Sequence, residues 1–151
     1  MVILAEELGH YWQTSQASPD SWLDRTEKLI EGHGGRVLSR GYGKADGRAA
    51  YMLGFELEGR RYRIVWPVLP TKKSEQAARI QAATLIHHDV KAKIVSALVL
   101  GNRTAFFQYL MLPDGRTTAE VADDELAFVL PDLNLPLLAA GDVTDGEYTE
   151  Q

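Results

Sequence analysis

Two short turns divide residues 36–68 into three segments, and this division constrains the fold more than any other feature. The first turn, over residues 44–47, contains Asp46-Gly47, and the second is Glu58-Gly59. An Asp-Gly pair flanked by strand-like residues is the strongest short signal for a β-hairpin. We therefore expect an antiparallel meander of three strands, over residues 36–43, 49–57 and 61–68.

The second and third segments alternate between apolar and other residues with a period of two. Tyr51, Leu53, Phe55 and Leu57 fall on one face of the second strand, and Tyr62, Ile64 and Trp66 fall on one face of the third. This pattern is typical of a sheet that packs on one side only. It predicts that the arginines of the third strand face away from the core. In the first strand, an even spacing groups three basic residues: Arg36, Arg40 and Lys44.

Helix signals flank the meander. Ser18-Pro19-Asp20 has the N-cap and N1 residues of a helix that ends at Gly32-His33-Gly34-Gly35. Ser74 opens the strongest helical pattern of the chain, over residues 74–99, with apolar residues at helical spacing. Residues 104–111 (TAFFQYLM) are interpreted as a further strand or a short amphipathic element, and residues 117–128 as a short helix.

This order predicts an α+β fold: a helix, a three-stranded antiparallel meander, a long helix, a further strand, a short helix and a disordered acidic tail. The 151 residues fit a single domain. We divide the chain into an N-terminal segment (1–18), one α+β domain (19–130) and an acidic flexible tail (131–151). The tail ends GDVTDGEYTEQ, which has too few large apolar residues to pack.

The composition excludes some kinds of site and indicates where in the cell the protein is found. The chain has no cysteine, which excludes disulfides, thiolate metal sites and cysteine nucleophiles. Its start, MVILAEELGHYWQ, has no basic region before the apolar residues, so we expect no signal peptide. No apolar run approaches the roughly 20 residues of a membrane span. We expect a cytoplasmic protein that does not enter a membrane.

Charge is strongly segregated along the chain. Residues 1–35 carry a net charge of −4, residues 36–103 carry +8, and residues 104–151 carry −9. A basic middle between acidic ends indicates a surface that binds a polyanion. The alternative is that the acidic ends pack against the basic middle and neutralise it.

No residue pattern points to catalysis, a cofactor or a metal. His87 and His88 are adjacent, so on a helix they point about 100° apart, and no strong ligand lies three or four residues from either. The segment 41–44 (GYGK) lacks the full spacing of a phosphate-binding loop. We expect no enzymatic activity, no cofactor and no bound metal.

The basic middle is interleaved with aromatic residues, a combination typical of single-strand binders, which hold the backbone electrostatically and stack bases on rings. Tyr42, beside glycines near a hairpin, is the best candidate for an exposed stacking residue, whereas Tyr62 and Trp66 belong to the core face. The predicted nucleic-acid-binding residues are Arg36, Arg40, Tyr42, Lys44, Arg48, Arg61, Arg63, Lys72, Lys73 and Arg79.

The run RAAYMLGFELEGRRYRIVWPV (48–68), followed by SEQAARIQAATLIHHDVKAK (74–93), resembles uncharacterised small proteins of phages and mobile elements. The order of elements is similar to that of single-strand annealing proteins and of Whirly-type single-strand binders. This resemblance implies a homo-oligomeric single-stranded DNA-binding protein of phage replication or recombination. The acidic tail is similar to tails that recruit replication or recombination proteins, but it lacks their terminal phenylalanine.

Two other interpretations remain open. The chain is alternatively a non-enzymatic protein-interaction module, such as a phage inhibitor or assembly factor. The third interpretation is a degenerate restriction-endonuclease-like fold, which has the same element order. Its magnesium-binding carboxylates and catalytic lysine are missing from the third strand, RYRIVWP.

Overall fold

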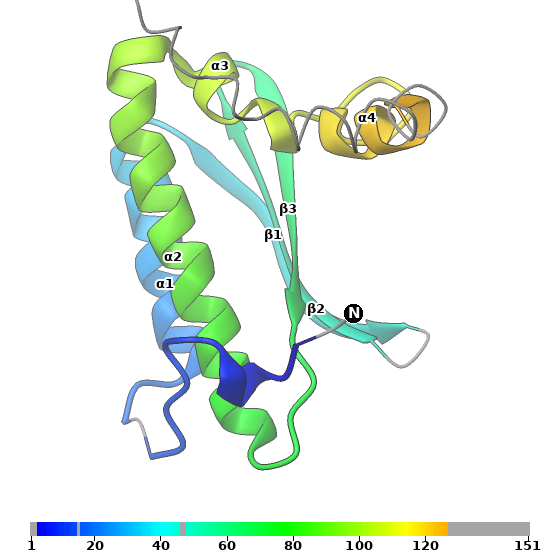
Figure 1. The fold of residues 1–151 in the computed structure, drawn as a ribbon. Helices are drawn as coiled ribbons and strands as arrows, with labels where there is room; N and C mark the ends of the chain where they lie inside the picture. Colours follow the sequence, from blue (N-terminus) through cyan, green and yellow to red (C-terminus); the bar gives the residue numbers. More distant parts are fainter. Residues whose placement is uncertain (1–2, 15, 46–47, 127–151) are drawn as a thin grey trace, which may run out of the picture.

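The computed structural model describes residues 3–14, 16–45 and 48–126 and has the expected α+β class (Figure 1). Asp46 and Gly47 of the predicted first turn, and the predicted tail over residues 131–151, lie outside the described residues. The elements are η1 (Ala5–Glu7), α1 (Pro19–Gly32), β1 (Arg36–Ala45), β2 (Arg48–Leu57), β3 (Arg60–Val68), α2 (Glu75–Leu100), α3 (Asn102–Ala105), η2 (Phe107–Tyr109) and α4 (Thr118–Leu126). No helix within these residues is long and apolar enough to cross a membrane.

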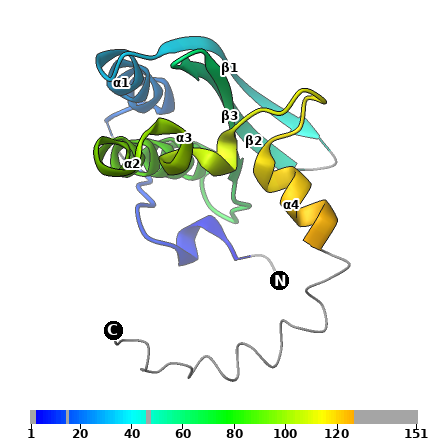
Figure 2. The ribbon, with the colours of Figure 1, turned by 90° about the horizontal axis from the view of Figure 1, so that it is seen from above.

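The three strands form the predicted antiparallel meander in the order β1-β2-β3. Helices α1 and α2 lie side by side along one face of this sheet (Figures 1 and 2). The register places Tyr62 opposite Phe55 and Ile64 opposite Leu53, so the apolar rows of neighbouring strands share the face under the helices. The opposite face carries exposed side chains, including Met52 and Val65.

The helix ends follow the predicted signals. The Ser18 hydroxyl accepts a hydrogen bond from the Ser21 amide at 3.0 Å, and the Ser74 hydroxyl accepts one from the Ala77 amide at 3.1 Å. At the end of α1, Gly34 has φ +93°, and the Gly35 amide donates back to the Ile30 carbonyl at 2.8 Å. This Schellman arrangement requires a left-handed residue, which explains the glycine.

Three aromatic rings form the centre of the core between sheet and helices. Phe55 and Tyr62 are stacked with centroids 5.5 Å apart, and Phe106 meets both rings at 5.6 and 5.9 Å. All three side chains are buried. Burying a large apolar side chain stabilises a fold by about 1.5–3 kcal/mol, so this cluster is a main source of stability.

The further strand expected over residues 104–111 does not form. The segment is helical in α3 and η2, and Leu110 makes a single antiparallel bridge with Tyr62. Phe106, Tyr109 and Leu110 are buried, whereas Phe107 is 54% exposed. This spacing of three and four residues is helical, and it lets Phe106 and Tyr109 point inward together, which strand alternation does not allow.

The even spacing of basic residues in the first strand does not place them on one face. A β-bulge between Val37 and Ser39 shifts the register by one residue. Arg36 therefore lies opposite Glu56 on the open face, whereas Arg40 lies opposite Leu53 on the helix side. A one-residue shift moves every later side chain to the other face, because the side-chain period of a strand is two.

The N-terminal segment contains the short helix η1 and crosses the start of α2. Gln81 is buried in α2, and its amide donates to the carbonyls of Ala5 at 2.8 Å and Gly9 at 3.0 Å. The Tyr11 hydroxyl donates to the Ser74 carbonyl at 3.1 Å. These contacts hold residues 5–11 against the fold and explain why a polar side chain is buried inside α2.

Candidate nucleic-acid interface

The acidic ends neutralise part of the predicted basic surface. Arg40 bonds to three carboxylates of α1: Asp24 at 2.7 Å, Glu27 at 2.9 Å and Asp20 at 3.1 Å. Partial burial opposes its charged form, but these hydrogen bonds outweigh the burial and raise the pKa of Arg40 above its ordinary value. Arg40 therefore holds α1 to the sheet and has no free charge for a ligand.

Two further predicted arginines, both on the open face, are also paired. Arg36 bonds to Glu56 at 2.7 Å, and Arg63 bonds to Glu120 of α4 at 3.0 Å. Arg61 lies on the same face, as predicted, and is exposed. Of these three arginines of the open face, Arg61 is the one without an ion-pair partner among the residues that the structure describes.

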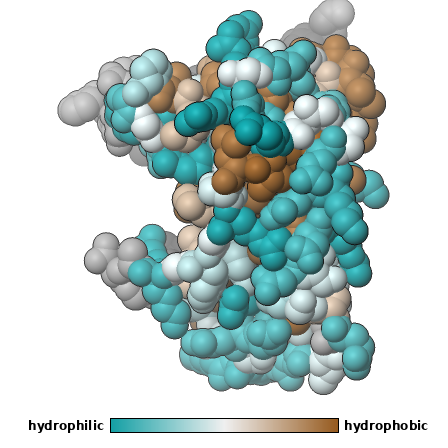
Figure 3. Space-filling view, turned by 180° about the vertical axis from the view of Figure 1, so that it is seen from behind, coloured by the Kyte–Doolittle hydropathy of each residue, from teal (hydrophilic) through white to brown (hydrophobic). Residues whose placement is uncertain are grey.

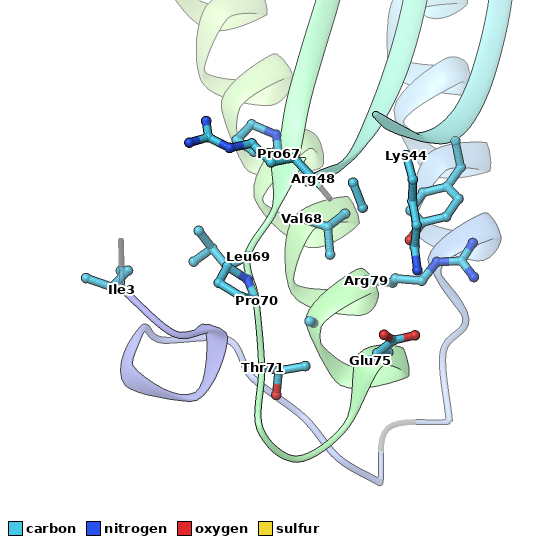
Figure 4. A pocket seen from close by; sticks show the side chains of 13 residues that line it. Ile3, Lys44, Arg48, Pro67, Val68, Leu69, Pro70, Thr71, Glu75 and Arg79 are labelled. Carbon is cyan, nitrogen blue, oxygen red and sulfur yellow. The ribbon is translucent and has the colours of Figure 1, made fainter. Parts of the chain in front are cut away.

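The remaining strand and helix residues of the predicted set meet in a pocket of about 710 Å³ where the sheet extends past the start of α2 (Figure 4). The pocket has a basic side and an apolar side. Figure 4 shows Lys44 and Arg79 across from Ile3, Leu69 and Pro70. We call it the basic pocket; its lining residues from the predicted set are Tyr42, Lys44, Arg48 and Arg79.

Arg79 of α2 is oriented by two tyrosines of the sheet. Its guanidinium carbon lies 4.1 Å from the centroid of the Tyr42 ring, and its Nε donates to the Tyr51 hydroxyl at 2.8 Å. Burial raises the pKa of Tyr51, although the Arg79 charge opposes this shift. Tyr51 therefore stays neutral at physiological pH, and the charge of Arg79 is not cancelled. Tyr42 is 38% exposed, as expected for a ring available to a ligand.

Within the described residues, none of the three cations of the basic pocket forms an ion pair. Lys44 and Arg48 are exposed, and no carboxylate of the described residues lies within 4.0 Å of Lys44, Arg48 or Arg79. Glu75, in the first turn of α2, is the acidic residue of the lining. Three cations against one carboxylate leave the pocket with a positive charge. Such a site attracts phosphate or carboxylate groups.

Lys72 and Lys73 lie in the loop between β3 and α2, next to the pocket residue Thr71. Glu6 holds this loop in place: its carboxylate accepts from the Thr71 hydroxyl at 2.8 Å and from the Lys72 amide at 3.2 Å. The hydrogen bond from Thr71 is the main cause that lowers the pKa of Glu6. Both lysines are exposed and lie outside the lining of the pocket.

The apolar side of the basic pocket was not anticipated from the sequence. It consists of Ile3, Ala49 and the segment Pro67–Pro70. The sequence does contain a signal for this apolar side, the run VWPVLP over residues 65–70. Its two prolines end the strand and leave a rigid apolar loop. Ile3 has no such signal, because its position depends on how residues 5–11 cross α2.

Three of the histidines, His10, His87 and His88, contact other aromatic rings. His87 shares a hydrogen bond of 3.3 Å with the Thr26 hydroxyl, and its ring lies 5.3 Å from that of Trp22. The ring centroids of His10 and His88 are 5.2 Å apart. No group of three histidine or acidic side chains with metal-binding geometry exists among the described residues.

Comparisons of the chain with protein-family models, with curated proteins and with solved structures find no match. The function is therefore inferred from the geometry and charge of the site.

Proposed function

We propose that this protein binds single-stranded nucleic acid, single-stranded DNA in particular, at the basic pocket. The observation that carries the proposal is that Lys44 and Arg79, beside the exposed ring of Tyr42, line one pocket with Arg48, which lies across from them next to Pro67, and that none of the three has an ion-pair partner in the described part of the chain. In this proposal the protein acts in the cytoplasm of a bacterial or phage-infected cell.

The chemistry of the pocket suits a nucleotide. The cations supply phosphate contacts, and Arg79 is preorganised by its hydrogen bond to Tyr51. The start of α2 adds the positive end of a helix dipole to the same side. The apolar side accepts a base, which must be unpaired to enter a pocket. Lys72 and Lys73 extend the positive potential beyond the pocket along the strand.

The test is fluorescence polarisation with labelled oligo(dT) and with duplex DNA at two salt concentrations. We expect oligo(dT) to bind more tightly than the duplex and to weaken steeply with salt, because phosphate contacts release counterions. The double variant Lys44→Ala/Arg48→Ala removes two exposed cations of the pocket. It should flatten the logarithmic salt slope by about one unit per lost contact.

Arg61→Ala is the matched control, since it removes one exposed cation from the open face of the sheet. We expect its affinity and salt slope to stay close to those of the unmodified protein. If Arg61→Ala weakens binding as much as a single pocket variant does, the open face binds the nucleic acid and the assignment to the basic pocket is wrong. Absence of salt-dependent binding to oligo(dT) overturns the function itself.

The second candidate function is a protein-interaction module that associates with a second copy of itself. The observation that favours it is a group of exposed apolar side chains where α2 ends, formed by Val95, Leu98, Val99, Leu100 and Phe107. The space-filling view in Figure 3 has a brown apolar region at its upper right, where the end of α2, at the upper left of Figure 1, comes to lie after the turn of 180°. Exposed apolar clusters of this kind mark contact surfaces.

A further inference from the structure

Strand β3 is one of the two edges of the sheet, and part of its outer backbone has no partner among the described residues. Alternate residues of an edge strand direct both N–H and C=O away from the sheet. Near one end the Arg61 carbonyl accepts from the Met111 amide at 2.9 Å, and beyond the other end the Pro70 carbonyl accepts from the Ala5 amide at 2.8 Å. Between them, within the described residues, no hydrogen bond reaches the outward N–H and C=O of Val65.

Pro67 fits this arrangement. It has the same outward parity as Val65, so its missing N–H removes no bond to β2. A proline here limits the free edge to a short stretch around Val65. This length prevents extended sheet-to-sheet aggregation, but it leaves room for a short peptide.

An apolar cavity of about 410 Å³ lies beside the free stretch. Val65 and Trp66 of β3 form one wall, Leu8 of the N-terminal segment forms another, and Leu85 of α2 contributes to the lining. Val65 is 52% exposed, so the cavity opens directly at the strand edge. A backbone ladder next to a side-chain pocket is the combination used in β-strand addition.

The apolar cavity adjoins the basic pocket. Ile3, Pro67 and Leu69 line both of them. A chain extended along β3 therefore passes from an apolar site to a positively charged one. These two neighbouring sites favour a peptide in which an apolar residue is followed or preceded by an acidic residue.

We propose that the free edge of β3 accepts an extended apolar and acidic peptide of a partner protein as a fourth strand of the sheet. Its backbone pairs with Val65, an apolar side chain enters the apolar cavity, and a carboxylate lies at the basic pocket. Nucleic acid has no strand backbone to pair with Val65 and no aliphatic group for this cavity. The proposal goes beyond nucleic-acid binding and does not depend on it.

The probe is a pool of fluorescein-labelled synthetic octapeptides with alternating Val, Leu, Ile or Phe and two aspartates at one end. We expect saturable binding below about 100 µM and slower hydrogen exchange of the Val65 amide in the complex, measured by NMR. A pool without detectable binding at that concentration overturns the proposal, as does a complex in which the Val65 amide exchanges unchanged.

Two variants test the site from different sides. Val65→Pro removes the outward N–H while leaving the ladder to β2 intact, and Leu8→Asp places a charge at the apolar cavity. Each should weaken peptide binding by about tenfold or more. Met52→Asp is the matched control, because Met52 and Leu8 are both 39% exposed and Met52 lies on the open face, outside the lining of the cavity.

Both site variants should retain binding of oligo(dT), whereas Arg48→Ala should weaken it. The two proposals therefore fail separately. Peptide affinity that is unchanged in Val65→Pro and in Leu8→Asp overturns the assignment to this edge. Equal losses of peptide affinity in Leu8→Asp and Met52→Asp also overturn the assignment, because the added charge alone would then explain the loss.

Discussion

Arg40 and Arg79 show how the surroundings of an arginine decide its role. Arg40 is surrounded by three carboxylates from one helix and links α1 to the sheet. Arg79 lies against the rings of Tyr42 and Tyr51, which hold its guanidinium without cancelling the charge. Only an arginine of the second kind is available to an anionic ligand, although both were equally plausible candidates by residue type.

At the same scale, His87 makes stability depend on pH. Burial, His88, Lys91 and Arg25 all lower the pKa of His87, so the folded state favours the neutral ring. The unfolded chain binds the proton more readily, so the free energy of unfolding should fall as the pH decreases below about 6.5. In urea denaturation between pH 7.5 and 5.5, His87→Gln should reduce this fall. The same pH dependence in variant and unmodified protein contradicts the assignment.

Gly35 is required by a close approach between α1 and the sheet. A Cβ at this position would lie 2.6 Å from Leu57 Cδ2 and 2.8 Å from Ile30 Cγ2. Gly35→Ala should lower the free energy of unfolding by about 1–3 kcal/mol, because this core side has no room for a methyl group. Gly41→Ala is the control: nothing lies within 4 Å of its Cβ, and its effect in the same urea titration should be within about 0.5 kcal/mol.

Among the elements, α2 packs against α1, β3, α3 and η1. Its first half is buried by the sheet, by α1 and by the N-terminal segment, which explains why Gln81 and Thr84 are buried along with its alanines. Its last turns extend into solvent with Leu98 and Val99 exposed. One helix thus anchors the core, places Arg79 in the basic pocket and presents an apolar end.

The start of α2 gives a prediction for helix capping. Ser74→Ala removes the hydroxyl that accepts from the Ala77 amide, and it should cost about 1 kcal/mol of stability. Ser74→Asp keeps an acceptor at the N-cap and should retain most of the stability. Urea denaturation of both variants distinguishes a lost cap from a general effect of changing residue 74. Equal destabilisation in the two variants contradicts the capping role.

The whole molecule combines a basic middle with acidic ends, of which the structure describes part. Residues 141–151 lie outside that part and carry Asp142, Asp145, Glu147 and Glu150 without a basic residue. Each exposed charge pair contributes only about 1 kcal/mol in water. Several tethered charges act together at high effective concentration, so we expect this segment to compete with phosphate for the basic pocket.

Stopping the chain after Ala140 should therefore tighten binding to oligo(dT) severalfold at low salt. The gain should shrink as salt screens the competition. Polarisation titrations of the full and shortened chains at two salt concentrations measure both effects. Unchanged affinity at low salt contradicts internal competition, and a lower thermal midpoint contradicts the expectation that the tail is dispensable for the fold.

The apolar end of α2 leads to a prediction about oligomeric state. Val99 is 83% exposed and Leu98 75%, so pairing with a second copy removes apolar surface from water. Sedimentation velocity should show a dimer, and Leu98→Asp/Val99→Asp should convert it to a monomer. Met52→Asp, on the open face of the sheet, should leave the dimer intact. A monomeric unmodified protein contradicts self-association through this surface.

Local signals predicted most of the fold. The meander, α1, α2 and α4 lie close to their predicted ranges, because capping residues, glycine turns and apolar periodicity act within a few residues. For the segment 104–111 the sequence left a strand and a short amphipathic element open, since its apolar residues are compatible with either period, and the structure has short helices there. The tertiary contact that favours the helical turn is the packing of Phe106 edge-on against the stacked rings of Phe55 and Tyr62.

For the candidate site, too, some features follow from the sequence and others only from the folded structure. The sequence by itself determined that the middle of the chain is basic and that Tyr42 lies near a hairpin, since these depend on residue types and short spacings. Tertiary structure decided which charges stay available. The bulge after Val37 moved Arg40 toward the carboxylates of α1, and the packing of α2 brought Arg79 against Tyr42 on the side of the pocket that Lys44 lines. Ion pairing depends on distances between residues far apart in sequence, and only the folded chain sets those distances.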